Sequence, residues 1–182
     1  MPDFHVQPAV RWHDMQQGRS SIPFLILLAC AAAFIGVTSR CSLPAVVASH
    51  FNAAGVANGF MTRALYVPFT FAFAVVLPLL LVFLSSRALN NPKARINLPN
   101  HEYWLAPERR AETADFVRRH LARFASMLAL LVCYVHWLVV RANALVPPSL
   151  SSFRFLGGLG VFLIFTGVWV MVFLGRFRKI AR

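Results

Sequence analysis

Residues 43–60, with the sequence LPAVVASHFNAAGVANGF, form a short turn-rich segment between two long apolar runs. Asn52-Ala-Ala-Gly55 and Asn58-Gly59 are turn signals, because asparagine and glycine tolerate the positive φ angles that tight turns need. Apolar residues that suit the strands of a small hairpin flank the first turn: Val46, Val47, Phe51, Val56 and Phe60. The segment therefore predicts a hairpin-like loop, within residues 39–63, that joins two membrane spans.

The composition is that of a membrane protein. The chain has 182 residues, of which 58% are hydrophobic, and its mean hydropathy is +0.63, too apolar for a soluble chain of this size. The length fits one domain, residues 1–182. The formal charge is +12, and the basic residues lie between and after the apolar runs. This distribution predicts contact with an anionic bilayer surface and no binding of nucleic acid.

Four apolar runs predict an all-α integral membrane protein with four transmembrane helices, at about residues 22–38, 64–84, 124–140 and 155–174. Residues 87–123 form the longest polar segment. A helix is expected to begin there at Pro107 and to continue without a break into the third span. Pro78 lies inside the second span, where a missing N–H predicts a kink.

Small residues at helical spacing predict where these spans approach one another. Ala29-xxx-Ala33 and Ala125-xxx-Ala129 are close-packing patterns on the first and third spans, and Gly160 and Gly167 share one face of the fourth. In the polar segment, Asp115 and Arg119 have the spacing of an i,i+4 ion pair.

The distribution of basic residues predicts the orientation. The N-terminal tail, the segment 87–123 and the C-terminal tail hold 14 of the 18 Lys and Arg residues, and the two remaining loops hold four. Because basic loops stay on the cytoplasmic side, both termini and residues 87–123 should be cytoplasmic. The loop 39–63 should face outward.

Two histidines are candidates for a functional role. His50 lies beside Asn52 in the outer loop, where a hydrogen bond that stabilises the hairpin is favoured over ligand or proton binding. His136 is the only histidine within a span, and ionisable groups at such positions are functional hypotheses by default. No metal or cofactor is expected, because the spaced Glu108, Glu112 and His120 are explained by the dipole at a helix start. No catalytic motif is present, so we expect no enzyme activity.

The helix that begins at Pro107 is strongly basic. Tyr103-Trp104 precedes it, an aromatic pair of the kind that settles at the depth of lipid headgroups. Its arginines include Arg109, Arg110, Arg118 and Arg119, more than the nearby carboxylates can neutralise. This segment predicts contact with anionic lipid or with a protein partner at the cytoplasmic face.

One pattern carries a family resemblance: Leu43-Pro44, His50-Phe51-Asn52, Gly55 and Asn58-Gly59-Phe60. Residues Ile22 to Leu84 resemble the small membrane domain of unknown function at the front of bacterial sporulation-delay immunity (SdpI-like) proteins. Asn58 stands where that pattern usually has an acidic residue. Tyr103 to Thr113 is similar to a segment of small proteobacterial relatives of the same domain. The resemblance implies a place in the bacterial inner membrane and a role in envelope sensing or in tolerance of a membrane-active toxin.

Together these features predict a non-enzymatic inner-membrane protein that acts by binding. Gly55 and Gly59 of the outer loop, with His50 and Asn52, would contact an envelope ligand or a partner, which includes another membrane protein or a second copy of the chain. One alternative is a small accessory subunit of a larger membrane complex. Another is a transporter or membrane enzyme that uses His136.

The orientation leads to a first prediction. Reporter fusions after Phe60, Arg95, Ser149 and Arg182 should report outside, inside, outside and inside, because basic segments remain cytoplasmic. Alkaline phosphatase and a fluorescent protein, active on opposite sides of the membrane, are suitable reporters. An outside signal after Arg95 would contradict the scheme.

Overall fold

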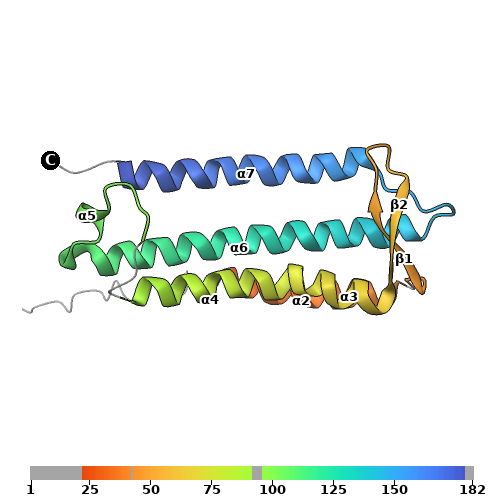
Figure 1. Cartoon of the computed structure of the whole chain (residues 1–182), viewed down its shortest axis with the longest axis horizontal. Coiled ribbons are helices and arrows are strands. Elements are labelled where there is room, and N and C mark those ends of the chain that lie inside the picture. Colours follow the sequence, from red (N-terminus) through yellow and green to blue (C-terminus); the bar gives the residue numbers. More distant parts are fainter. Residues whose placement is uncertain (1–21, 42, 92–95, 179–182) are drawn as a thin grey trace, which may run out of the picture.

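The computed structural model of the protein describes residues 22–41, 43–91 and 96–178. Within them, long helices lie side by side, with a two-stranded hairpin at one end of the bundle (Figure 1). In chain order the elements are α2 (Ile22–Arg40), β1 (Val46–Phe51), β2 (Ala57–Thr62), α3 (Arg63–Phe71), the π-helical η1 (Ala72–Val76), α4 (Leu77–Asn90), α5 (His101–Trp104), α6 (Pro107–Asn143) and α7 (Ser152–Arg178).

Among the described residues, four helices are long and apolar enough to cross a membrane. They are α2, the run α3–η1–α4, α6 and α7. The prediction of an all-α protein with four membrane spans is therefore confirmed, and the chain is a multi-pass membrane protein. Both chain ends, for which the sequence predicts a cytoplasmic location, lie outside the described residues.

The helix α6 is the longest element and packs against α2, α4 and α7. Its 37 residues form one helix with Pro107 in its first turn, which confirms the continuous helix predicted from the sequence. At a rise of about 1.5 Å per residue such a helix is about 55 Å long, well beyond the roughly 30 Å of a hydrocarbon core. The excess length is the basic segment before residue 124.

The second span is irregular close to Pro78. The π-helical turn η1 ends two residues before this proline, between the α-helical segments α3 and α4. Pro78 has no N–H to offer the carbonyl four residues earlier, Ala74, which lies inside that turn. The sequence predicts a kink at Pro78, and the structure has a π-helical turn directly before it, which the sequence did not predict.

The small residues of α6 form a close-packing face, but those of α2 do not. Ala125 and Ala129 are fully buried, as predicted, whereas Ala29 and Ala33 are exposed. The side of α2 that faces the bundle carries larger side chains: Leu27, Cys30 and Phe34. Large groups on one helix lie over small groups on the other, so only one of the two helices needs alanines.

The predicted glycine face of α7 is also wrong. A Cβ atom added at Gly160 or Gly167 would meet no atom within 4 Å. The close approach is at Gly158 instead, where an added Cβ would overlap the ring of Tyr134 on α6. The Tyr134 hydroxyl donates a hydrogen bond to the carbonyl of Arg154, 2.8 Å away, and this fixes the ring against α7.

The hairpin is antiparallel, with Val46 opposite Thr62 and irregular pairing near His50. Val47 is fully buried and belongs to a cluster with Val139 of α6. The side-chain amide of Asn143, near the end of α6, accepts a hydrogen bond from Ala48 N–H (2.8 Å) and donates one to Ala48 C=O (3.0 Å). The amide thus pairs with β1 as a strand would, and this anchors the hairpin to the bundle.

The hairpin turn is the first of the two predicted from the sequence. Gly55 has a φ of +80°, and its N–H donates to the carbonyl of Asn52 (2.9 Å). The second predicted turn, at Asn58-Gly59, is wrong, because both residues lie within β2. Gly59 is needed there for space: a Cβ atom on it would lie 2.8 Å from the Cβ of His50.

The turn leads to a second prediction. Gly55→Ala should lower the free energy of unfolding by about 1 kcal/mol or more, because alanine is strained at positive φ and its Cβ would overlap the carbonyl oxygen of Leu150. Unfolding of the purified protein in detergent, followed by circular dichroism, measures the change. Gly36→Ala is the matched control, since an added Cβ there meets nothing within 4 Å. Equal stability of wild type and Gly55→Ala would contradict the assignment.

Candidate functional site

His136 is buried inside the bundle at the end that carries the hairpin, with 1% of its surface exposed. Its Nε2 lies 3.0 Å from the hydroxyl of Thr38 on α2, and its Nδ1 lies 3.1 Å from the hydroxyl of Tyr66 on α3. Thr38 donates its own proton to the carbonyl of Phe34 (2.8 Å). Nε2 therefore carries a proton and donates to Thr38, and Nδ1 accepts from Tyr66.

The imidazole is also stacked between aromatic rings. Its centroid lies 4.0 Å from that of Phe34, at an interplanar angle of 21°, and 5.8 Å from that of Tyr66. Hydrogen bonds and stacking together connect α6 to both α2 and α3. Both nitrogens of His136 are occupied, which is the arrangement of a buried polar group that stabilises a helix interface.

A cavity of about 320 Å³ lies between this network and the hairpin. His136 and Tyr66 line it from the bundle, and Ser49 and His50 line it from β1. Its other lining residues are mostly apolar: Met61, Phe69, Thr70, Val132, Val135 and Val139. The two histidines singled out from the sequence, 86 positions apart in the chain, thus face one cavity. No sequence pattern indicated that they would meet.

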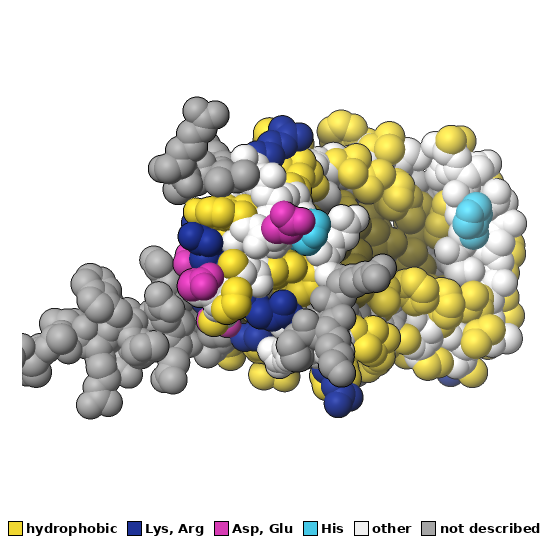
Figure 2. Space-filling view, turned by 60° about the vertical axis from the view of Figure 1, so that its left-hand side comes forward, with side chains coloured by type: hydrophobic (Ala, Val, Ile, Leu, Met, Phe, Trp, Pro, Cys, Tyr) yellow, Lys and Arg dark blue, Asp and Glu magenta, His cyan; other side chains and the backbone are white. Residues whose placement is uncertain are grey.

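A second cavity, of about 360 Å³, lies next to the first. The two share Ser49, His50, Val135 and Val139, and the second extends to Phe155 at the start of α7. Val135 and Val139 are one helical turn apart, so one face of α6 forms the floor of both cavities. Figure 2 shows apolar side chains around a hollow below α7, on the side of the molecule between its two ends.

His50 makes the hydrogen bond that the sequence favoured. Its Nδ1 lies 2.7 Å from Oδ1 of Asn58 on the paired strand, and the side chain is exposed. Asn52 contributes to the turn, because its Oδ1 accepts the N–H of Val56 (2.9 Å). Ligand binding by these two residues stays a prediction. Their observed contacts lie within the hairpin.

The other sequence-predicted residues lie at the opposite end of the bundle, where charged side chains gather (Figure 2). Tyr103 stacks beneath the guanidinium of Arg109, 4.0 Å from the ring centroid to Cζ. Trp104 donates its indole N–H to the carbonyl of Phe177, 3.2 Å away, and so holds the end of α7. Both rings therefore have structural contacts within the protein.

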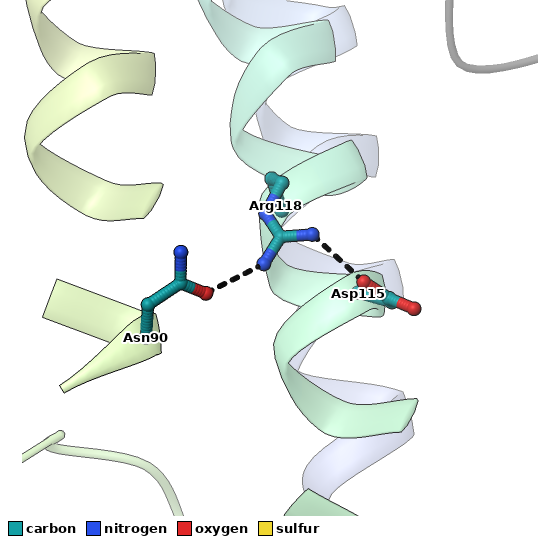
Figure 3. A network of polar contacts seen from close by, with 3 residues as sticks. All are labelled: Asn90, Asp115 and Arg118. Atoms are coloured by element: carbon teal, nitrogen blue, oxygen red, sulfur yellow. Dashed lines mark hydrogen bonds and ion pairs between the residues drawn. The ribbon is translucent and has the colours of Figure 1, made fainter. Parts of the chain in front are cut away.

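Arg118 connects α6 to the end of α4 (Figure 3). One guanidinium nitrogen lies 2.8 Å from Asp115, and the other donates to Oδ1 of Asn90 (3.0 Å). The predicted Asp115–Arg119 pair is therefore wrong, because Arg118 lies between Asp115 and α4 and can reach both. Arg110 donates to the carbonyl of Asn91 (2.9 Å). Arg119 makes no hydrogen bond or ion pair with another described residue.

A second buried histidine, His120, joins α6 to α7, a role that the sequence did not predict. Its Nε2 lies 3.0 Å from the carbonyl of Trp169 on α7, and the indole of Trp169 donates to the carbonyl of His120 (2.9 Å). Phe116 and Phe173 stack against the His120 ring, with centroids 5.3 and 5.4 Å away. The i,i+4 spacing of Phe116 with His120, and of Trp169 with Phe173, was the available signal.

One continuous part of the chain matches a known family model. Residues 24–82 match the family model for a domain of unknown function, DUF1648. The match confirms the resemblance of residues 22–84 to a domain of unknown function. The DUF1648 segment contains most of α2, the hairpin and most of the second span, and so supplies Thr38, His50 and Tyr66. His136 and the floor of the cavities lie outside it, on α6. No curated protein and no solved structure matches the chain.

The network leads to a third prediction. His136→Ala should lower the free energy of unfolding by about 2 kcal/mol or more, because it removes the group that accepts the Tyr66 hydroxyl proton and also the stacked ring. His50→Ala should cost less than about 1 kcal/mol, because its side chain is exposed. Unfolding in detergent measures both. A larger loss for His50→Ala would show that the network is not the stabilising element.

Proposed function

We propose that this is a non-enzymatic protein of the bacterial inner membrane that binds an amphipathic ligand in the cavity beneath its hairpin. The observation that carries the proposal is the shared cavity of His50 and His136. Apolar walls with a few converging polar groups are typical of sites that bury an apolar ligand and orient it by hydrogen bonds. The termini and residues 87–123 would lie on the cytoplasmic side, and the hairpin would face outward.

The chemistry of the lining residues narrows the class of ligand. No carboxylate is among the described residues that line either of the two cavities beneath the hairpin (the hairpin cavities). Ser49 and His50 line both cavities, so the site offers a hydroxyl and an imidazole to a neutral or anionic group. The valine floor on α6 suits an aliphatic portion. A membrane-active peptide or lipid-like molecule has both parts. The resemblance to SdpI-like immunity proteins supports the same role, envelope sensing or tolerance of a membrane-active toxin.

The contacts of His136 favour binding over catalysis or transport. Both of its nitrogens are engaged by Tyr66 and Thr38, so a proton or substrate would have to displace one of these hydroxyls. For the described residues we find no cluster of three or more metal-ligating side chains. A transporter or enzyme centred on His136 is the less favoured alternative.

An accessory subunit of a larger complex, or a homo-oligomer, is the second alternative. The apolar stretch of α7 has no buried residue within the protein, and in the described chain this helix packs mainly on α6. Bilayer lipid or another membrane protein would cover that surface. Co-purification separates these cases, since an obligate subunit arrives with stoichiometric partners.

The ligand proposal leads to a fourth prediction. Val135→Trp should abolish the protective effect of the protein on cells exposed to a membrane-active peptide, because Val135 lines both hairpin cavities and the larger indole would occupy part of their space. Cell survival at equal expression measures the effect. Val168→Trp is the matched control, on an exposed site of α7 that lines neither cavity. If both variants protect as wild type does, the hairpin cavities are not the binding site.

A further inference from the structure

A separate set of cavities lies on the other side of α6, towards the basic end of the bundle. The first, of about 80 Å³, lies between α2, α4 and α6 and is lined by Arg118, Arg119 and Arg123 together with Pro23, Phe24, Val82, Ser86 and Ala122. Arg118 is engaged by Asp115 and Asn90. Arg119 and Arg123, four residues apart on one helix face, have no hydrogen bond or ion pair with the other described residues.

This arginine cavity continues into apolar space. A cavity of about 340 Å³ shares Pro23 and Arg123 with it and extends along α2 to Ile26. That cavity in turn shares Met127 and Leu130 with one of about 480 Å³ between α6 and α7. Three cavities thus meet end to end along one side of α6, with arginines at one end and the ring of Tyr134 at the other.

The dimensions match one leaflet of a bilayer. Arg123 and Tyr134 are eleven residues apart on a continuous helix, which is about 16 Å along its axis. Half of a hydrocarbon core of roughly 30 Å is about 15 Å. The groove that these three cavities form therefore runs from headgroup depth to about the middle of the membrane. This is the extent of one acyl chain in one leaflet.

The charges select the kind of lipid. None of the described residues that line the three cavities is acidic, so Arg119 and Arg123 create a positive potential that nothing in the groove offsets. The start of α2 lies in the same cavity and adds the positive end of its helix dipole. A guanidinium group binds a phosphate oxygen pair through its two parallel N–H groups.

We propose that this groove is a site for an anionic phospholipid. Its phosphate lies between Arg119 and Arg123, and one acyl chain follows α6 past Met127 and Leu130 to the space beside Tyr134. The arginines are at the opposite end of the bundle from the hairpin cavities, and no described residue lines both the groove and those cavities, so the site is independent of the ligand proposed there. The proposal also gives a role to Arg119 and Arg123. In contrast to Arg110 and Arg118, their side chains make no hydrogen bond with another described residue.

Titration with defined lipids tests the proposal. Purified protein in detergent is mixed with phosphatidylglycerol or with phosphatidylcholine of the same acyl chains, and bound lipid is counted by native mass spectrometry. Phosphatidylglycerol should bind more tightly. Arg123→Gln should weaken this binding about fivefold, and the double variant Arg119→Gln/Arg123→Gln about 25-fold, since each arginine at the headgroups contributes about one such factor.

Two controls separate a built site from general attraction to charge. Arg87→Gln removes one exposed charge near the same end of the bundle, but Arg87 lines none of the three cavities. Binding should change less than twofold. Leu130→Trp blocks the groove where two cavities meet and should weaken both lipids. Equal losses for Arg87→Gln and Arg123→Gln, equal binding of the two lipids, or unchanged binding by Leu130→Trp would each overturn the proposal.

Discussion

The hydrogen bonds of His136 hold the hairpin end of this bundle together. Within a bilayer, contact between apolar helices gains little from the hydrophobic effect, so interhelical hydrogen bonds and close packing fix how helices meet. Tyr66 and Thr38 bring α3 and α2 to the same imidazole on α6. With these three helices fixed in rotation, Val139 is placed under Val47 and Asn143 reaches Ala48, one and two turns further along α6. The hairpin and the cavity beneath it depend on this arrangement.

The spans and the hairpin turn could be predicted from the sequence because local properties determine them. Hydropathy and length decide which runs cross a bilayer, and a glycine at positive φ three residues after an asparagine determines the turn at Gly55. Asn58-Gly59 is also a turn signal in the sequence, yet both residues lie in a strand, and Gly59 packs against His50 across the hairpin. Nothing in the spacing of Thr38, Tyr66 and His136 indicates that three helices bring them together.

The partners of individual side chains were harder to predict than the helices and strands, because they also depend on contacts between segments far apart in the sequence. The alanine patterns on two spans look equivalent in the sequence, but only the one on α6 packs against another helix. Leu27 and Cys30 of α2 fill the space beside the alanines of α6. Asp115 has two arginines within reach on its own helix, and the position of Asn90 on α4 decides between them. In both cases the deciding atom belongs to a segment distant in the sequence, whose position is known only once the bundle is built.

The uninterrupted α6 has a mechanical consequence. A helix without a proline, glycine or π-turn in its interior has no joint at which a rotation can be absorbed, in contrast to the second span with its π-helical turn. Val135, on the floor of the hairpin cavities, and Arg119, at the basic end, are fixed to the same rigid rod. If the rod turns at one membrane surface, it turns at the other. A rotation of α6 would therefore move the residues at both of its ends together.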